Sequence, residues 1–278
     1  MTMLKVYKPR NAELRKHIEC FYVYTRDADD DPVRYLTFPS IFTLVSISKD
    51  SLTTETELGL RTEYCAGNPI EANLVCAFNK PVCIEYSGQI DEITIYFKPL
   101  GINAFLPDDL CVYNTGQYAD FDPFGDLKSR MKAILTQADV EKRLSDLETY
   151  WLSKLVGFDH PLLENVIGEM FADDGESIPV AQLARKYGVS RSTLNNHFAR
   201  HICKSPSEMR KVIRFRRAMQ DRYVARDRKR LTDITYGLNY FDQSHMIKDF
   251  RSLTGYSPAK FFSSISELEN GQINWLFL

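Results

Sequence analysis

The 278-residue sequence lacks any hydrophobic run that could cross a membrane, which needs about 18 consecutive apolar residues. Its first residues, MTMLKVYKPRNAELRK, lack the apolar stretch of a signal peptide, so we expect a cytoplasmic protein without a membrane partner. The six cysteines form no CxxC motif and no close Cys/His pairs. This spacing disfavours a zinc or disulfide framework and indicates small buried hydrophobic residues in a reducing compartment.

Motifs of the common enzyme classes are also missing. No P-loop, GxGxxG or Ser/His/Asp arrangement occurs, and the first 175 residues contain only two histidines, His17 and His160. A metal-dependent cupin-type catalyst is the enzyme alternative for a β-rich domain, and it needs a cluster of metal ligands. We therefore expect no catalysis, no cofactor and no metal, and stoichiometric iron or manganese in purified protein would revive the alternative.

Neither sign of charge dominates the whole chain, whose formal net charge is −2, but the charges are unevenly distributed. Residues 176–262 carry 18 Lys and Arg against 7 Asp and Glu, whereas residues 1–175 carry 17 against 28. An acidic half joined to a basic half indicates a polyanionic partner for the basic half only.

Residues 1 to about 98 predict a β-rich domain. Seven short segments rich in aromatic and β-branched residues are bounded by Asp, Pro, Gly and Asn clusters, as in a sandwich or barrel. They are CFYVYT, VRYLTFP, IFTLVSIS, LRTEYCAG, NLVCAF, CIEYSG and EITIYFKP. Five aromatic residues could line a ligand pocket or, the interpretation we favour, fill the core: Tyr22, Tyr24, Tyr35, Phe38 and Tyr96.

From about residue 100 the apolar period becomes helical and predicts helices as far as residue 171. Within residues 138–155, apolar side chains recur at positions 140, 144, 147, 151 and 155. This stripe can pack onto the β domain, which we favour, or form a homodimer surface anchored by Tyr150 and Trp151. The polar segment ADDGESI, residues 172–178, predicts the domain boundary.

A helix-turn-helix pattern occurs twice after this boundary. PVAQLARKY ends at Gly188, which can adopt the left-handed conformation, and Ser190 is placed as the N-cap of RSTLNNHFARH. LTDITYGL ends at Asn239, and Asp242 caps QSHMIKDFRSL. The two units repeat at an offset of 51 to 52 residues, and an Arg-rich segment between them predicts a long basic linker helix.

Residues 178–262 resemble the DNA-binding domain of the AraC/XylS family of bacterial transcription regulators. The resemblance is carried by LARKYGVSRSTLNNHF, RFRRAM and LNYFDQSHMIKDFRSLTGYSPAKFF, and the acidic half resembles more loosely the β-rich domain of some such regulators. It implies two recognition helices in successive major grooves of double-stranded DNA and RNA polymerase as a partner. The N-terminal domain is then expected to sense a small-molecule effector, to dimerise, or to bind only another protein.

The overall expectation is an α+β protein of two domains. Residues 1–172 form a cupin-like barrel or sandwich with a helical extension, residues 178–262 form an all-α domain, and residues 263–278 form a tail.

Cys203 stands where the family usually has a glycine before Ser-Pro, so a different turn or a strained backbone is expected there.

The helical period also separates the residues available for DNA contacts from those that turn into the core. Leu194 and Phe198 turn inward, so the opposite face of the helix is available to bases. Candidates for base contacts are Ser192, Asn195, Asn196, Ser244, His245 and Lys248. Candidates for phosphate contacts are Arg191, Arg200, Lys204, Gln243, Arg251 and the linker arginines. Any base candidate could instead contact phosphate, which accepts at least half of the hydrogen bonds at such interfaces.

His197 and His201 are four residues apart on the first reading helix, which is a spacing of metal ligands. Apart from nearby Cys203, no further ligand is obviously placed beside them, and a structural zinc ion needs four. We interpret the two histidines as ordinary residues of a recognition helix.

Overall fold

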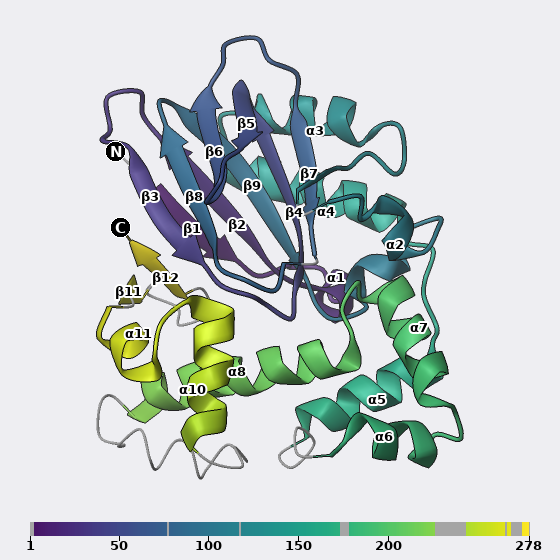
Figure 1. Ribbon diagram of the computed structural model, residues 1–278. Coiled ribbons are helices and arrows are strands. Elements are labelled where there is room, and N and C mark those ends of the chain that lie inside the picture. Colours follow the sequence, from purple (N-terminus) through teal and green to yellow (C-terminus); the bar gives the residue numbers. More distant parts are fainter. Residues whose placement is uncertain are drawn as a thin grey trace.

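The computed structural model describes residues 3–76, 78–116, 118–172, 178–225, 243–264, 266–267 and 274–277. A β-rich N-terminal region is followed by helices and by a helical C-terminal region (Figure 1), which confirms the predicted fold class. No helix in these ranges combines the length and apolarity needed to cross a bilayer. Most of the segment predicted as the domain boundary, residues 173–177, lies outside the described residues.

Within the described residues, the strands form two six-stranded sheets. All neighbouring strands of the first sheet are antiparallel. In spatial order these strands are β1 (Met3–Tyr7), β2 (Ile18–Arg26), β9 (Ile90–Phe97), β4 (Thr43–Lys49), β7 (Glu71–Val75) and β10 (Ala119–Asp120).

The second sheet combines strands from the N-terminal and C-terminal regions of the chain. Its strands, in spatial order, are β11 (Ser266–Glu267), β12 (Asn274–Phe277), β3 (Val33–Thr37), β8 (Val82–Ser87), β6 (Gly59–Tyr64) and β5 (Ser51–Glu55). β12 pairs antiparallel with β3, so the segment predicted as a tail adds a strand to the N-terminal region. Each of the seven segments predicted as strands forms one, and they are β2, β3, β4, β6, β7, β8 and β9.

The first sheet buries both faces, as the alternation along β9 shows. Ile93, Ile95 and Phe97 face a core shared with the following helices. Glu92 and Thr94 point to the other side, toward the second sheet. Because successive side chains of a strand point to opposite faces, a mixed sequence such as IDEITIYF can fill a core and line a cavity at once.

Helices cover the outer face of the first sheet. They are α1 (Leu14–His17), η1 (Gly101–Ala104), α2 (Leu110–Tyr113), α3 (Leu127–Leu135) and α4 (Val140–Ser153). The next helix, α5 (Pro161–Phe171), packs instead with the C-terminal helices. Trp151 on α4 is 0% exposed, and its ring lies 5.0 Å from that of Phe97 and 5.2 Å from that of Phe105. The apolar stripe of residues 138–155 therefore packs within the chain, which is the alternative favoured above.

The C-terminal helices are built around one long helix. They are α6 (Val180–Lys186), α7 (Arg191–His201), α8 (Pro206–Ala225), α10 (Gln243–Thr254) and α11 (Pro258–Ser264). Met209 and Ile213 of α8 pack with α5, α6 and α7. Phe215 and Met219 of the same helix pack with α10 and α11. The predicted linker helix thus contributes to two separate cores and fixes the two units relative to each other.

Candidate nucleic-acid interface and internal pocket

The turn of the first helix-turn-helix unit forms as its sequence predicts. Gly188 adopts a φ of +67°, and Val189 N donates to the carbonyl oxygen of Ala184 at 3.0 Å. Ser190 is the N-cap of α7, because its Oγ accepts from Thr193 N at 3.0 Å. These contacts fix the angle at which α7 leaves α6.

The two faces of α7 are used differently. Leu194 and Phe198 are fully buried in the core of the first unit. Ser192, Asn195 and Asn196, the residues predicted to contact bases, are all exposed. Their side chains therefore lie where a nucleic acid could reach them without any unfolding of the unit.

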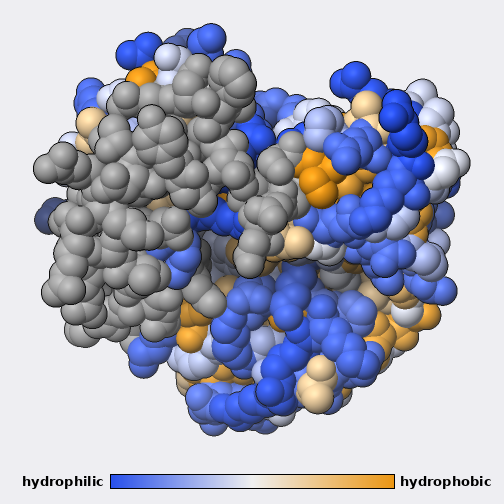
Figure 2. Space-filling model, turned by 90° about the horizontal axis from the view of Figure 1, so that it is seen from below, coloured by the Kyte–Doolittle hydropathy of each residue, from blue (hydrophilic) through white to orange (hydrophobic). Residues whose placement is uncertain are grey.

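The second unit repeats this division on α10. Met246 and Phe250 are buried in the second core, whereas Ser244, Lys248 and Arg251 are exposed. Seen from the helical side, the described surface is mostly hydrophilic, with smaller hydrophobic areas (Figure 2). The predicted turn and cap residues, Asn239 and Asp242, lie outside the described part of the chain, as do the side chains of Gln243 and His245.

The turn after each reading helix requires a left-handed residue. Gly255 follows α10 with a φ of +78°, and Cys203 follows α7 with a φ of +56°. A side chain in this conformation clashes with its own backbone, which costs roughly 1–2 kcal/mol. Of the two expectations for Cys203, the strained backbone is correct.

Lys204 does not lie on the surface expected of a phosphate contact. Its side chain is buried, and its ammonium group donates to the carbonyl oxygen of Cys76 in the N-terminal region. Burial lowers the pKa of this lysine. The sequence-based assignment is wrong for this arrangement, because a position near the end of a recognition helix does not reveal which neighbour covers it.

Arg200 is occupied by a carboxylate from the N-terminal region. Its Nε and Nη2 lie 2.8 and 2.6 Å from Oδ2 of Asp109, just before α2. The adjacent backbone is also held, because Asn103 Nδ2 donates to the carbonyl oxygen of His201 at 2.9 Å. The C-terminal end of α7 is thus docked onto η1 and α2, and Arg200 is available to phosphate only if this ion pair opens.

Three linker arginines predicted as phosphate contacts serve internal contacts instead. Arg214 pairs with buried Asp249 of α10 at 2.9 Å. Arg216 donates to the carbonyl oxygens of Phe38 and Pro39 at 2.8 and 3.0 Å, and burial lowers its pKa to about 10. Arg217 donates to the carbonyl oxygen of Phe171 at 2.6 Å. The basic character of α8 therefore serves structure at these positions.

A cavity of about 300 Å³ lies between the two sheets. Of the five aromatic residues proposed for a pocket, three line it: Tyr22, Tyr35 and Tyr96. Tyr24 instead packs beside Tyr86, with ring centroids 4.8 Å apart. Phe38 leaves the β region and inserts into the core formed by α8, α10 and α11. Its assignment to the pocket is wrong, because a strand end can contact another domain that local sequence does not reveal.

The cavity contains a buried carboxylate that the sequence analysis missed. Glu92 is 5% exposed, and its oxygens accept from the Tyr86 hydroxyl at 2.9 Å and from Thr94 Oγ1 at 2.7 Å. Within the described residues no lysine or arginine pairs with it, and burial raises its pKa. The available signal was a glutamate on the inward-facing side of a strand otherwise rich in apolar residues.

The charged lining of the cavity is mainly acidic. Its described residues include three glutamates (Glu55, Glu57 and Glu92) against one lysine, Lys80. Five tyrosines complete the aromatic part of the lining: Tyr22, Tyr35, Tyr86, Tyr96 and Tyr118. A volume near 300 Å³ is at the lower end of the range for small-molecule sites.

Comparison with protein families supports the C-terminal assignment. Residues 183–264 match the model of a family described as a helix-turn-helix domain, which confirms the AraC-type DNA-binding domain predicted above. A search of curated proteins gave no match.

Among solved structures, the chain is similar to ToxT from Vibrio cholerae. The structure of unsaturated fatty acid-bound ToxT from strain SCE256 has a TM-score of 0.45 at 15% identity, over 87% of this chain and 94% of that one. ToxT from strain O395 has a TM-score of 0.41 at 11% identity, over 95% and 96% of the two chains. The same protein bound to (E)-4-(8-methylnaphthalen-1-yl)but-3-enoic acid gives 0.41 and 11%, over 94% and 98%.

Proposed function

From the AraC-type helix-turn-helix domain over residues 183–264, we propose that the chain is a sequence-specific DNA-binding transcription regulator of the AraC family. In this proposal α7 and α10 enter successive major grooves, and the N-terminal region senses an effector. The observation that carries it is the division of both helices into an exposed polar flank and an apolar flank buried beside α8. The cytoplasm as location and RNA polymerase as partner follow from the family resemblance.

The candidates divide by the chemistry of their side chains. Asn195 and Asn196 can each form two hydrogen bonds with adenine, and Lys248 can donate to guanine. Ser192, Ser244 and His245 complete the proposed base contacts. Arg191, Gln243 and Arg251 are proposed to hold phosphates, and they position the domain without reading sequence. Lys204 and the internally bonded linker arginines are left out of this set.

The specificity claim is tested on sites selected from random DNA, by fluorescence anisotropy. We expect Asn196→Ala to lower the preference for the selected site by about 1–3 kcal/mol, the usual discrimination of a bidentate pair. The matched control is Thr149→Ala, which changes an exposed polar residue of α4. An unchanged ratio of specific to non-specific affinity removes Asn196 from the base contacts, and affinity that does not fall with salt contradicts the whole proposal.

We further propose that the cavity between the sheets binds the effector and that the effector is a small organic cation with an apolar body. A buried carboxylate without a counter-cation is costly in its ionised form, so an ammonium group beside Glu92 stabilises both partners. Tyrosine faces attract cations further, by about 0.5–2 kcal/mol per well-placed ring. The three glutamates of the lining match this sign of charge.

The effector class is tested with octylammonium against octanoate, two probes of the same chain length and opposite charge. We expect octylammonium to raise the melting temperature of the full-length protein and octanoate to have little effect, because the mainly acidic lining repels an anion. Glu92→Gln keeps the shape of the side chain and should abolish the preference for the cation. If Glu92→Gln binds octylammonium as well as the unmodified protein does, the pocket assignment fails.

A further inference from the structure

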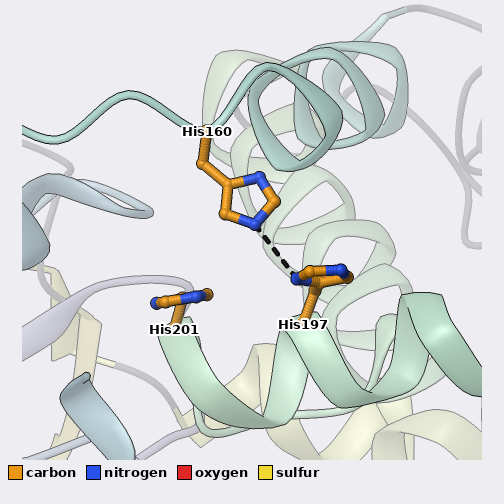
Figure 3. Close-up of side chains that lie close together, drawn as sticks. All are labelled: His160, His197 and His201. Carbon is orange, nitrogen blue, oxygen red and sulfur yellow. Dashed lines mark hydrogen bonds between the residues drawn. The ribbon is translucent and has the colours of Figure 1, made fainter.

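Three histidines from the two halves of the molecule meet beside the first reading helix. His160 immediately precedes α5, and His197 and His201 lie on successive turns of α7 (Figure 3). The sequence pattern contained the α7 pair but no third ligand, because 37 residues separate His160 from His197. Packing of α5 against the first unit brings His160 to them.

The distances between the rings are those of groups able to share one ion. Nε2 of His160 lies 3.1 Å from Nδ1 of His197, and one ring nitrogen of each histidine lies within 4.8 Å of the others. Ligands at about 2.1 Å from a tetrahedral ion are roughly 3.4 Å apart. The first pair, at 3.1 Å, is close to this spacing, and the third nitrogen, within 4.8 Å of the others, must move by at most about 1.4 Å to reach it.

Two further observations favour a ligand at this cluster. Nδ1 of His201 is buried and has no hydrogen-bond partner in the described part of the molecule. The carboxylate of Asp109 is beside it, with Oδ1 3.5 Å from that nitrogen, while Oδ2 is held by Arg200. Asp109 thus offers an anionic oxygen either as a fourth ligand or as the acceptor that orients His201.

We propose that His160, His197 and His201, with Asp109 beside them, bind one divalent transition-metal ion of the kind that prefers imidazole, such as Zn²⁺. Imidazole nitrogens suit zinc, nickel and copper, whereas magnesium and calcium prefer oxygen. The alternative use of the cluster is a purely aromatic and hydrogen-bonded contact between the two halves.

The protons of the cluster can be accounted for in both states. Without metal, Leu163 N donates to Nδ1 of His160 at 3.3 Å, so the ring proton of His160 is on Nε2, facing His197. The ion takes the place of that proton, which moves to Nδ1, and the long bond from Leu163 is given up. Zinc binding requires His197 and His201 in their neutral form, so the affinity should fall as the pH is lowered.

Occupancy of this site should affect DNA binding, an expectation that rests on the function proposed above. His197 directly follows Asn196 on α7, and the ion would join this helix to the segment before α5. Metal would therefore hold the reading helix in its docked position, in addition to the contacts of Asp109 and Asn103.

Binding is tested on the full-length chain, freed of any tag, treated with EDTA and kept reduced. Calorimetric titration with Zn²⁺ should give one ion per chain, and Co²⁺ should give the visible absorption of a nitrogen- and oxygen-ligated tetrahedral site. We expect His160→Gln and His197→Gln each to weaken Zn²⁺ binding at least tenfold. The control is His17→Gln, a half-buried histidine on α1 that should leave the affinity unchanged.

Circular dichroism of the metal-free variants serves as the check that they fold. The proposal is overturned if the folded wild-type chain binds no Zn²⁺ at micromolar concentration, or if both variants bind it as tightly as the control does. DNA affinity measured with and without Zn²⁺ forms a separate arm. Tight metal binding with unchanged DNA affinity keeps the site and rejects the coupling, and failure to bind any DNA rejects the proposed function without affecting the metal titration.

Discussion

The two helix-turn-helix units are held to the N-terminal region by different kinds of contact. The first unit shares an apolar core with α5, but the exposed end of α7 is held by polar groups: Arg200 pairs with Asp109, and His197 hydrogen bonds with His160. The side chain of Arg200 is 57% exposed and that of Asp109 29% exposed. Such pairs are screened by salt and usually contribute less than about 1 kcal/mol.

The second unit is held mainly by apolar burial. Phe38 is 0% exposed and lies against Phe261 and Phe215, with ring centroids 5.0 and 6.4 Å away. The backbone beside it is fixed by Arg216, and β12, which follows α11, pairs with β3. Apolar contacts and a strand pairing do not depend on charge. The comparison therefore indicates that the polar contacts of the first unit open more easily than the apolar anchor of the second.

Truncation of the aromatic anchor should have the largest effect on this comparison. Phe38→Ala leaves a cavity among the phenylalanines of the second core, and such a change in a buried site costs about 3–5 kcal/mol. The measurement is the free energy of unfolding in urea. Phe171→Ala is the matched control, because that side chain is 38% exposed and should cost much less. Equal losses in the two variants would remove Phe38 as the anchor.

A smaller effect is expected at the turn after the second reading helix. Gly255→Ala puts a side chain on a residue with a φ of +78° and open space around its Cβ. Backbone strain alone should therefore lower the stability, by roughly 1–2 kcal/mol. Gly168→Ala inside α5 also adds a Cβ in open space and should instead stabilise by up to about 1 kcal/mol. Thermal unfolding checks the opposite signs, and a destabilising Gly168→Ala would contradict the explanation by backbone conformation.

The smallest change in stability is expected for the ion pair of the first unit. Asp109→Asn, measured in EDTA, should lower stability by less than about 1 kcal/mol and yet strengthen DNA binding, because Arg200 is released toward phosphate. One additional phosphate contact should steepen the slope of log affinity against log salt by about 0.9. Asp108→Asn removes the same charge from the neighbouring exposed residue and serves as the control. An unchanged slope would show that Arg200 is not a releasable contact.

Elements with a strong local pattern could be predicted from the sequence. Gly188 adopts the expected left-handed turn and Ser190 caps α7, because both depend on residues within one helical turn. The seven β-rich segments formed strands for a similar reason, since alternation and bounding turn residues are local. β1 and β5 were missed, and the short segments MLKVY and SLTTE carry a weaker signal of this kind.

Several site residues could not be predicted, because their roles depend on contacts distant in sequence. Lys204 has the charge of a phosphate contact but is buried against the carbonyl oxygen of Cys76, 128 positions earlier. Phe38 was expected near a pocket and instead joins a core with Phe215. Glu92 stands out in the sequence only as a glutamate in an apolar-rich strand, and only the packing of the two sheets against each other places it in a cavity.

The sequence by itself determined the cap and turn of the first unit and the apolar faces of both reading helices, and with them a helix-turn-helix domain beside an acidic β-rich region. These features depend on backbone preferences and side-chain periodicity within a few neighbouring residues, so the local sequence determines them. Only the tertiary structure decided which cations remain exposed, which histidines meet and where β12 pairs. Those outcomes arise from packing between segments far apart in the chain, where small differences in burial select one neighbour among many.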